Sequence, residues 1–195
     1  MKKTFNLGSK VIVSDPCYKI PTWCQAVVKD VLPGTYVSEI DEYDGEDWGI
    51  RISKLRAIHQ DHILTRHHIK WTAHEVTIGV DSGQAGIFDF DHYRDDDHSE
   101  TYDLPLIFGD DWNSDKGDKW YQRMCALTLS KEDNVLGLSE DGFGCSPDGV
   151  VSRSGYGDGP YTLFIGKVGD QIVGFEIEFI GEDDEDEDEE DDDED

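Results

Sequence analysis

Apolar residues alternate with polar residues or glycine over residues 173–179, just before the acidic end of the chain. The pattern predicts one face made of Val173, Phe175, Ile177 and Phe179, and an opposite face made of Gly174, Glu176 and Glu178. A period of two is typical of a β-strand with one buried face. Gly169-Asp170 separates two such runs, so the sequence predicts a hairpin that turns at this dipeptide.

Shorter runs predict strands in much of the remaining chain. Residues 10–14 (KVIVS) predict a strand that Pro16 ends, and residues 35–52 predict a hairpin with a type I′ turn at Asp44-Gly45. Residues 67–83 supply one or two strands and residues 85–91 another. From residue 125 to residue 155 we expect short strands separated by Gly and Asp turns.

Two segments show helical spacing instead. In residues 21–34 the apolar positions are Trp23, Cys24, Val27, Val28 and Val31, and Pro33-Gly34 would end the helix. Residues 118–127 (DKWYQRMCAL) predict a second short helix. The sequence therefore predicts a mainly β fold, either an antiparallel sandwich or a strongly bent sheet, with one or two short helices.

Residues 182–195 are all Asp or Glu. A run of like charges with no apolar residue has nothing to bury, so we expect a single domain over residues 1–181 and a disordered polyacidic tail. The chain has a formal charge of −28, and the 31 acidic residues of the domain against 17 basic ones still give −14. This charge disfavours direct binding to nucleic acid, and no apolar run reaches the ~18 residues that a membrane helix needs.

The cysteines (Cys17, Cys24, Cys125 and Cys145) form no C-x-x-C pair. No apolar stretch of a signal peptide follows the first lysines, so we expect a cytoplasmic protein with reduced thiols. Asp15 stands two residues before Cys17. A neighbouring carboxylate raises the pKa of a thiol, which makes Cys17 a poor nucleophile.

Two polar clusters invite comparison with metal sites. Residues 89–100 match part of a calcium loop, but Tyr93 and Arg94 stand where the loop requires an oxygen ligand and a glycine. A looser carboxylate site from Asp81, Asp89 and Asp91 is the alternative to a solvated acidic loop. The histidines between residues 59 and 74 lack the spacing for one tetrahedral zinc site on a strand; they are His59, His62, His67, His68 and His74. We therefore expect no metal and no cofactor.

Residues 154–161 (SGYGDGPY) place three glycines ahead of the last hairpin. Gly155, Gly157 and Gly159 permit positive φ or close approach of the backbone, so the structural interpretation is a corner between two strands. Asp158 would fasten this corner by accepting hydrogen bonds from nearby N–H groups. The residues that follow alternate as a strand and lack the Lys-Ser/Thr of a phosphate-binding loop.

Residues 150–179 resemble the C-terminal signature of a domain family of unknown function, found in bacteria and their phages. The signature is a Ser-Gly-Tyr/Trp-Gly-Asp-Gly-x-Tyr run followed by a hairpin. VIVSDPCY at residues 11–18 and VTIGVDSGQAGIFD at residues 76–89 fit the same resemblance more weakly. The resemblance implies a shared fold and no particular reaction. It leaves room for a phage origin, in which small acidic proteins bind and block host proteins.

The sequence is compatible with two kinds of function. The first is a non-enzymatic binding or inhibitory protein whose acidic surface and tail engage a basic protein partner, such as a nucleic-acid-binding or defence protein. The second is a metal-dependent, hydrolase-like enzyme, which would require its aspartates to meet in one pocket; these are Asp15, Asp81, Asp89 and Asp158. We favour the first because no ligand set has the required spacing, and we assign no catalytic residue. The candidate binding residues are Asp15, Asp81, Asp89, Gly155, Tyr156, Gly157, Asp158, Gly159 and Tyr161.

Overall fold

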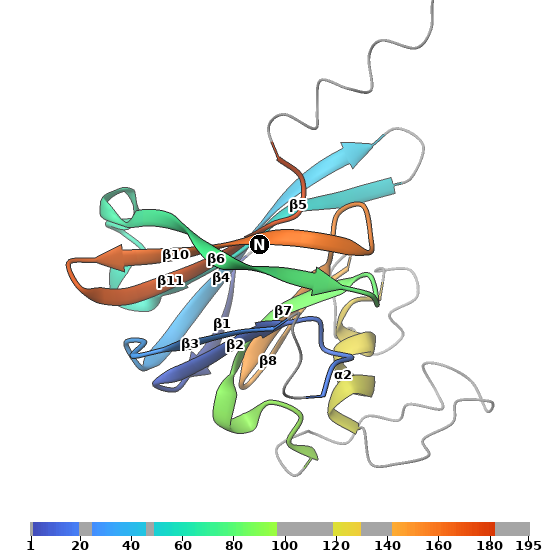
Figure 1. Cartoon of the computed structure of the whole chain (residues 1–195), viewed down its shortest axis with the longest axis horizontal. Coiled ribbons are helices and arrows are strands. Elements are labelled where there is room, and N and C mark those ends of the chain that lie inside the picture. Colours follow the sequence, from blue (N-terminus) through green and yellow to red (C-terminus); the bar gives the residue numbers. More distant parts are fainter. Residues whose placement is uncertain (1, 20–24, 46–48, 97–118, 130–141, 182–195) are drawn as a thin grey trace, which may run out of the picture.

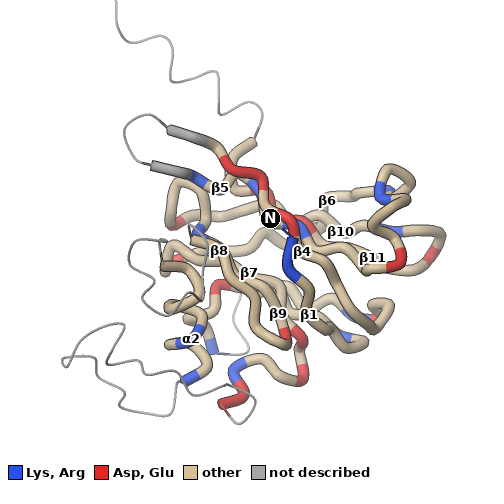
Figure 2. The backbone as a smooth tube through the Cα atoms, turned by 180° about the vertical axis from the view of Figure 1, so that it is seen from behind, with Lys and Arg blue, Asp and Glu red and all other residues tan. Residues whose placement is uncertain are grey.

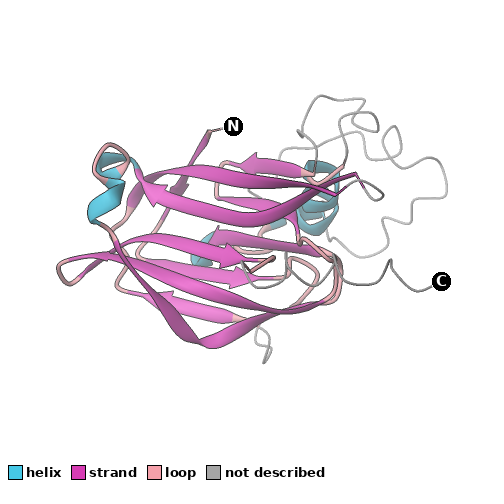
Figure 3. Cartoon of the chain, turned by 90° about the horizontal axis from the view of Figure 1, so that it is seen from above, coloured by secondary structure: helices cyan, strands magenta, loops and turns pink. Residues whose placement is uncertain are grey.

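The computed structural model describes residues 2–19, 25–45, 49–96, 119–129 and 142–181 (Figure 1). Its strands form two antiparallel sheets that pack face to face, as the view from above shows (Figure 3). The prediction of a mainly β fold is confirmed. The fold is the antiparallel sandwich and not a single strongly bent sheet. The predicted disordered tail, residues 182–195, lies outside the described residues.

The first sheet has six strands in the order β1-β4-β5-β11-β10-β6. Their bounds are β1 Lys3–Leu7, β4 Gly34–Gly45, β5 Gly49–His59, β6 Lys70–Val80, β10 Gly159–Val168 and β11 Gln171–Glu178. The second sheet has five strands in the order β3-β2-β7-β9-β8. Their bounds are β2 Lys10–Ser14, β3 Ala26–Lys29, β7 Gln84–Asp89, β8 Phe143–Ser146 and β9 Gly149–Arg153.

The main core lies between the two sheets. Its largest fully buried members include Tyr36, Leu55, Ile78 and Phe175 from the six-stranded sheet and Ile87 from the five-stranded sheet. Apolar side chains at alternate positions of each strand supply this layer, which is how an antiparallel sandwich removes apolar surface from water.

Helix α2 (Lys119–Leu127) confirms the predicted second helix. It covers the outer face of the five-stranded sheet, where Trp120 and Met124 pack against Phe88 (Figure 1). The Trp120 and Phe88 rings meet edge to face at 5.0 Å, and the N–H of Trp120 donates to Asp96 Oδ1 at 2.9 Å at the start of the helix.

The predicted helix over residues 21–34 is wrong where the structure describes it. Ala26–Lys29 is strand β3, in which Ala26 and Val28 are buried while Val27 and Lys29 are exposed. Adjacent valines satisfy a helical and a strand pattern equally over so short a run, but β-branched residues favour strands. Strand β2 pairs with this segment in an antiparallel ladder, which satisfies its backbone hydrogen bonds as a strand. Trp23 and Cys24 lie outside the described residues.

The β4–β5 hairpin forms as predicted, but its turn is not at Asp44-Gly45. Both residues belong to the ladder, where Gly45 pairs with Gly49. This longer register places Val37 opposite Ile58 and Ile40 opposite Leu55. Pairing of apolar side chains therefore overrides the local turn signal.

The last hairpin turns at Gly169, whose φ is +60°, as predicted. The predicted apolar face is wrong in one position. Gly166 pairs with Gly174 but Lys167 pairs with Ile172, so Val173 is the extra residue of a β-bulge. The bulge turns Val173 to the outer face of the sheet, where it packs with Ile58 and Ile69. Phe175, Ile177 and Phe179 stay in the main core.

Charged side chains lie beside this apolar cluster on the outer face. Register places Arg56 between Glu39 and Glu176, and Lys54 between Asp41 and Glu178. Arg56 forms an ion pair with Glu176, and Lys54 approaches Glu178 to 3.5 Å. Acidic and basic positions lie close together around β4 and β5 in Figure 2.

Three 3₁₀ turns complete the described fold: η1 Gln60–His62, η2 Arg66–His68 and η3 Phe90–His92. Between residues 125 and 155 the predicted short strands are β8 and β9, whereas Cys125–Leu127 belongs to α2. Residues 130–141 lie outside the described part.

Candidate functional site

The carboxylate of Asp15 is fully buried at the end of β2 and accepts four hydrogen bonds. Its Oδ1 accepts from Cys17 N at 2.8 Å and from Ser82 Oγ at 2.7 Å. Its Oδ2 accepts from the N–H groups of Asp81 and Ser82 at 2.9 and 2.8 Å. A buried carboxylate needs such partners to replace lost hydration. All of them belong to the protein, so Asp15 fastens the loop between β6 and β7.

Asp158 holds the same loop from the other side. Its Oδ1 accepts from Gly83 N at 3.0 Å, and the N–H of Ser154 donates to Gly83 O at 3.1 Å. Three consecutive N–H groups, from residues 81 to 83, therefore point at carboxylates of distant segments. Asp158 therefore accepts a hydrogen bond from a backbone N–H group, as predicted, but this group belongs to the neighbouring loop and not to the glycine corner itself.

The glycine corner is closed by Ser154 and Tyr161 instead. The Tyr161 hydroxyl lies 3.0 Å from Ser154 O and 2.7 Å from Gly157 O, and Ser154 Oγ donates to Gly157 O at 2.7 Å. Gly155 and Gly157 adopt φ values of +44° and +102°, as the structural interpretation expected. A Cβ on Gly155 would stand 2.9 Å from Phe179 Cβ, whereas a Cβ on Gly157 would meet nothing within 4 Å.

Tyr156 is exposed at the tip of this corner. Its ring lies under the Arg51 guanidinium, with 4.9 Å between the guanidinium carbon and the ring centroid. Gly159 leads directly into β10. The motif residues are thus mainly engaged in building one corner, and Tyr156 is the member that presents a large side chain to solvent.

Asp89 lies apart from the other predicted aspartates. It pairs with Val11 in the ladder, four residues before Asp15 along β2, a separation of roughly 13 Å at a strand's rise. Its Oδ2 accepts from Gly8 N at 2.6 Å and its Oδ1 from Asp91 N at 3.0 Å. Asp15, Asp81 and Asp158 therefore lie around the loop between β6 and β7. Asp89 instead accepts hydrogen bonds from Gly8 and Asp91.

The cysteines of the described residues are free thiols: Cys17, Cys125 and Cys145. Burial, followed by the hydrogen bond and charge of Asp15, raises the pKa of Cys17 to about 12. Burial also raises the pKa of Cys145 to about 11. A thiol with so high a pKa holds little thiolate at neutral pH, so the predicted weakness of Cys17 as a nucleophile agrees with its surroundings.

The clustered histidines divide into separate pairs. The rings of His59 and His62 stand 5.9 Å apart, and those of His67 and His68 stand 4.0 Å apart in η2. His74 lies on β6, where its Nδ1 accepts from Val76 N at 3.1 Å. Within the described ranges, no three His, Cys, Asp or Glu side chains are placed to hold a metal ion.

A cavity of about 290 Å³ borders the loop that Asp15 and Asp158 hold. Ser82, Gly83 and Gln84 form one wall, and the end of α2 with Arg153 forms the other. Arg153 closes this wall by donating from Nε to Thr128 O at 3.0 Å. Among the residues that the structure describes, none of the predicted binding residues lines this cavity; Asp15 and Asp158 hold the loop that forms one of its walls.

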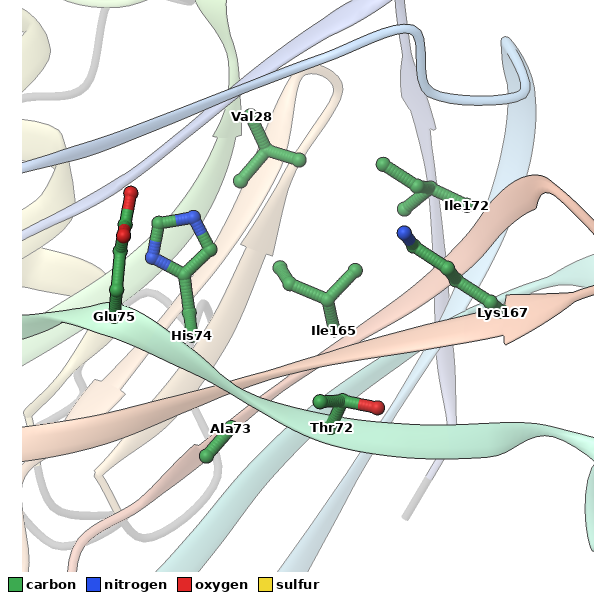
Figure 4. Close-up of a pocket in the computed structure, with 8 residues that line it drawn as sticks. All are labelled: Val28, Thr72, Ala73, His74, Glu75, Ile165, Lys167 and Ile172. Carbon is green, nitrogen blue, oxygen red and sulfur yellow. The ribbon is translucent and has the colours of Figure 1, made fainter.

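A larger groove of about 420 Å³, here called the β3–β6 groove, opens between the two sheets at their edge strands (Figure 4). Apolar side chains from three strands line its middle, namely Val28, Ile165 and Ile172. Its polar lining is Thr72, His74, Glu75 and Lys167. In Figure 4 His74 and Glu75 lie toward one end and Lys167 toward the other, with Val28 and Ile165 between them.

A β-bulge shapes this groove. Thr162 pairs with Thr77 but Phe164 pairs with Ala73, so β6 carries extra residues around His74 and Glu75. Bulges of this kind redirect side chains at sheet edges and next to functional sites. Lys167 and Thr72 were not among the residues predicted from the sequence. The available signal was Lys167 itself, which continues the alternate positions of Tyr161, Leu163 and Ile165 with a charged side chain.

Comparisons with protein-family models, with curated proteins and with solved structures find no match for this chain. In the part of the chain that the structure describes, no helix combines the length and the apolar character needed to cross a membrane.

Proposed function

We propose that this chain is a non-enzymatic binding protein whose polyacidic tail and acidic body engage a basic protein partner. One observation carries the proposal: 14 consecutive carboxylates are joined to a body that has a net charge of −14 of its own. A polyanion of this density attracts the basic faces that proteins use to bind nucleic acid. The partner class is therefore nucleic-acid-binding or defence proteins, and the resemblance to a bacterial and phage family would place that partner in a bacterial host.

The attachment point of the tail supports this proposal. Phe179 and Ile180 are buried, and their N–H groups both donate to Ser53 O, at 2.8 and 3.1 Å. The Ser53 hydroxyl in turn donates to the carbonyl of Asp41 at 3.3 Å, and the side chain of Asp41 is exposed. The residues that precede the tail are therefore fixed to β5, near the exposed Asp41 of β4.

The engagement of the aspartates favours binding over the metal-dependent alternative. Both oxygens of Asp15 and of Asp89 accept hydrogen bonds from the protein itself. Hard cations require several carboxylate oxygens at one point. Carboxylates already committed to backbone N–H groups make poor candidates for that role.

The test is a displacement assay with a purified basic DNA-binding protein bound to a fluorescent duplex. Four chains are compared: the full chain, a chain ending at Gly181, a chain whose tail carries Asn and Gln in place of Asp and Glu, and a chain whose tail residues are reordered. The full and reordered chains should displace the DNA. The other two should be at least about tenfold weaker, with the difference shrinking between about 50 and 200 mM salt.

The amide tail is the matched control, because it keeps length and side-chain size while removing charge. Equal displacement by the amide tail and the native tail would contradict the proposal. Thermal unfolding of all four chains gives the second readout. No apolar residue follows Gly181, so we expect the melting temperature of the truncated chain to be unchanged, or slightly raised at low salt. A clear fall would show that the tail contributes to folding.

A further inference from the structure

We infer that the β3–β6 groove binds an aliphatic chain that ends in a carboxylate, with the chain over Val28 and Ile165 and the carboxylate at Lys167. This site is separate from the tail and does not depend on the proposed function. The inference rests on the groove's apolar floor, on Lys167 at one end with Lys70 as its ladder partner, and on the arrangement of His74 and Glu75 at the other end.

The floor of the groove is continuous with the main core. Val28 and Ile165 are buried members of that core, and the half-buried Ile172 packs against it. A volume of about 420 Å³ lies within the range of small-molecule sites, which are typically lined by apolar side chains with a few polar groups that fix orientation. An aliphatic chain would cover this floor and remove its exposed part from water.

Two lysines stand directly opposite each other at one end. Lys167 of β10 pairs with Lys70 of β6, two positions beyond the pair of Ile165 with Thr72. Because Ile165 faces the core and side chains alternate, both lysines lie on the core-facing side of the sheet. Like charges directly opposite are unfavourable, and neither lysine forms an ion pair with another described residue. An anionic headgroup between them would relieve the repulsion and gain charge-assisted hydrogen bonds.

The opposite end of the groove sets the orientation. His74 is held by the bond from Val76 N to its Nδ1, which leaves Nε2 as the donor of the neutral ring. Glu75 is exposed beside it. A carboxylate at this end would meet the Glu75 carboxylate, whereas at the other end it meets the ammonium group of Lys167, whose ladder partner is Lys70. The headgroup therefore belongs at Lys167, and the chain runs toward His74.

Calorimetric titration of the full chain with octanoate tests the inference. We expect saturable one-to-one binding, weakened at least about tenfold by Lys167→Met, which removes the charge and keeps the aliphatic stem. Lys29→Met is the matched control, because Lys29 neighbours Val28 on β3 but points to the opposite face. It should stay within about twofold of the native chain. Acetate lacks the chain and octylamine carries the wrong charge, so neither should saturate.

Methyl NMR of the native chain provides a readout that depends on no variant. Octanoate should shift the methyl signals of Val28, Ile165 and Ile172 and leave that of Ile12, which lies under α2, in place. The inference is overturned by any of four results: no saturable octanoate binding, equal affinity of Lys167→Met and the native chain, octylamine binding as tightly as octanoate, or methyl shifts outside the groove.

Discussion

Asp15→Asn separates a structural from a chemical role for the most buried carboxylate of the predicted site. Asn keeps the size of Asp but replaces one acceptor oxygen by an NH₂ donor. If the amide nitrogen takes the Oδ2 position, it faces the N–H groups of both Asp81 and Ser82. If it takes the Oδ1 position, it faces Cys17 N and the Ser82 hydroxyl. The hydroxyl can rotate to accept a bond, but a backbone N–H cannot.

The better orientation therefore still loses one charge-assisted hydrogen bond and leaves one buried N–H unsatisfied. A hydrogen bond to a charged group contributes about 1.5–3 kcal/mol, and an unsatisfied buried donor costs about 1–3 kcal/mol. We expect Asp15→Asn to lower the free energy of unfolding by about 2–4 kcal/mol. This is a large part of the total stability of a typical domain, about 5–15 kcal/mol.

Urea unfolding followed by tryptophan fluorescence measures this change, with the slope m unchanged. Asp81→Asn is the matched control, because the exposed Asp81 takes part through its backbone N–H and keeps that group in the variant. The control should change stability by less than about 0.5 kcal/mol, as surface substitutions usually do. Unfolding of Asp15→Asn at the same urea concentration as the native chain would contradict this role of the Asp15 carboxylate.

Four further predictions concern other parts of the site. Gly157→Val should cost about 1–3 kcal/mol through backbone strain alone, because φ is +102° and the added side chain meets no neighbour; an unchanged melting temperature would refute it. Asp158→Asn should be milder in the same assay, since Asn can still accept from Gly83 N, and a larger loss than that of Gly157→Val would contradict this. Alkylation of Cys17, followed by mass spectrometry of its peptide, should be slow at pH 8 and should increase up to the pKa of about 12; a plateau near pH 9 would show an ordinary thiol. Titration with Ca²⁺, Mg²⁺ or Mn²⁺ should show no micromolar one-to-one site, and a site abolished by Asp89→Asn would overturn that expectation.

Local pattern was sufficient for several elements. The alternation after Gly159 predicted β10 and β11 and the turn at Gly169, because a period of two and a turn residue are properties of neighbouring positions. The spacing in residues 118–127 likewise predicted α2. The glycines at positions 155 and 157 indicated positive φ for the same reason, since the freedom to adopt it belongs to the residue itself.

Other features depended on partners that are distant in the sequence. Residues 26–29 form a strand because they pair with β2. Val173 lies on the opposite face from the predicted one because a β-bulge interrupts the pairing of β10 with β11. Asp15 reaches the loop at Ser82 across 67 positions, and no local pattern indicates which N–H groups a carboxylate will meet. The β3–β6 groove joins Val28 to Lys167 in the same way. The sequence alone determined which segments alternate, bend and turn, because these are short-range properties of side chains and backbone. Which segments face each other depends on contacts between distant parts of the chain, because strand pairing follows from the total burial and hydrogen bonding of the fold.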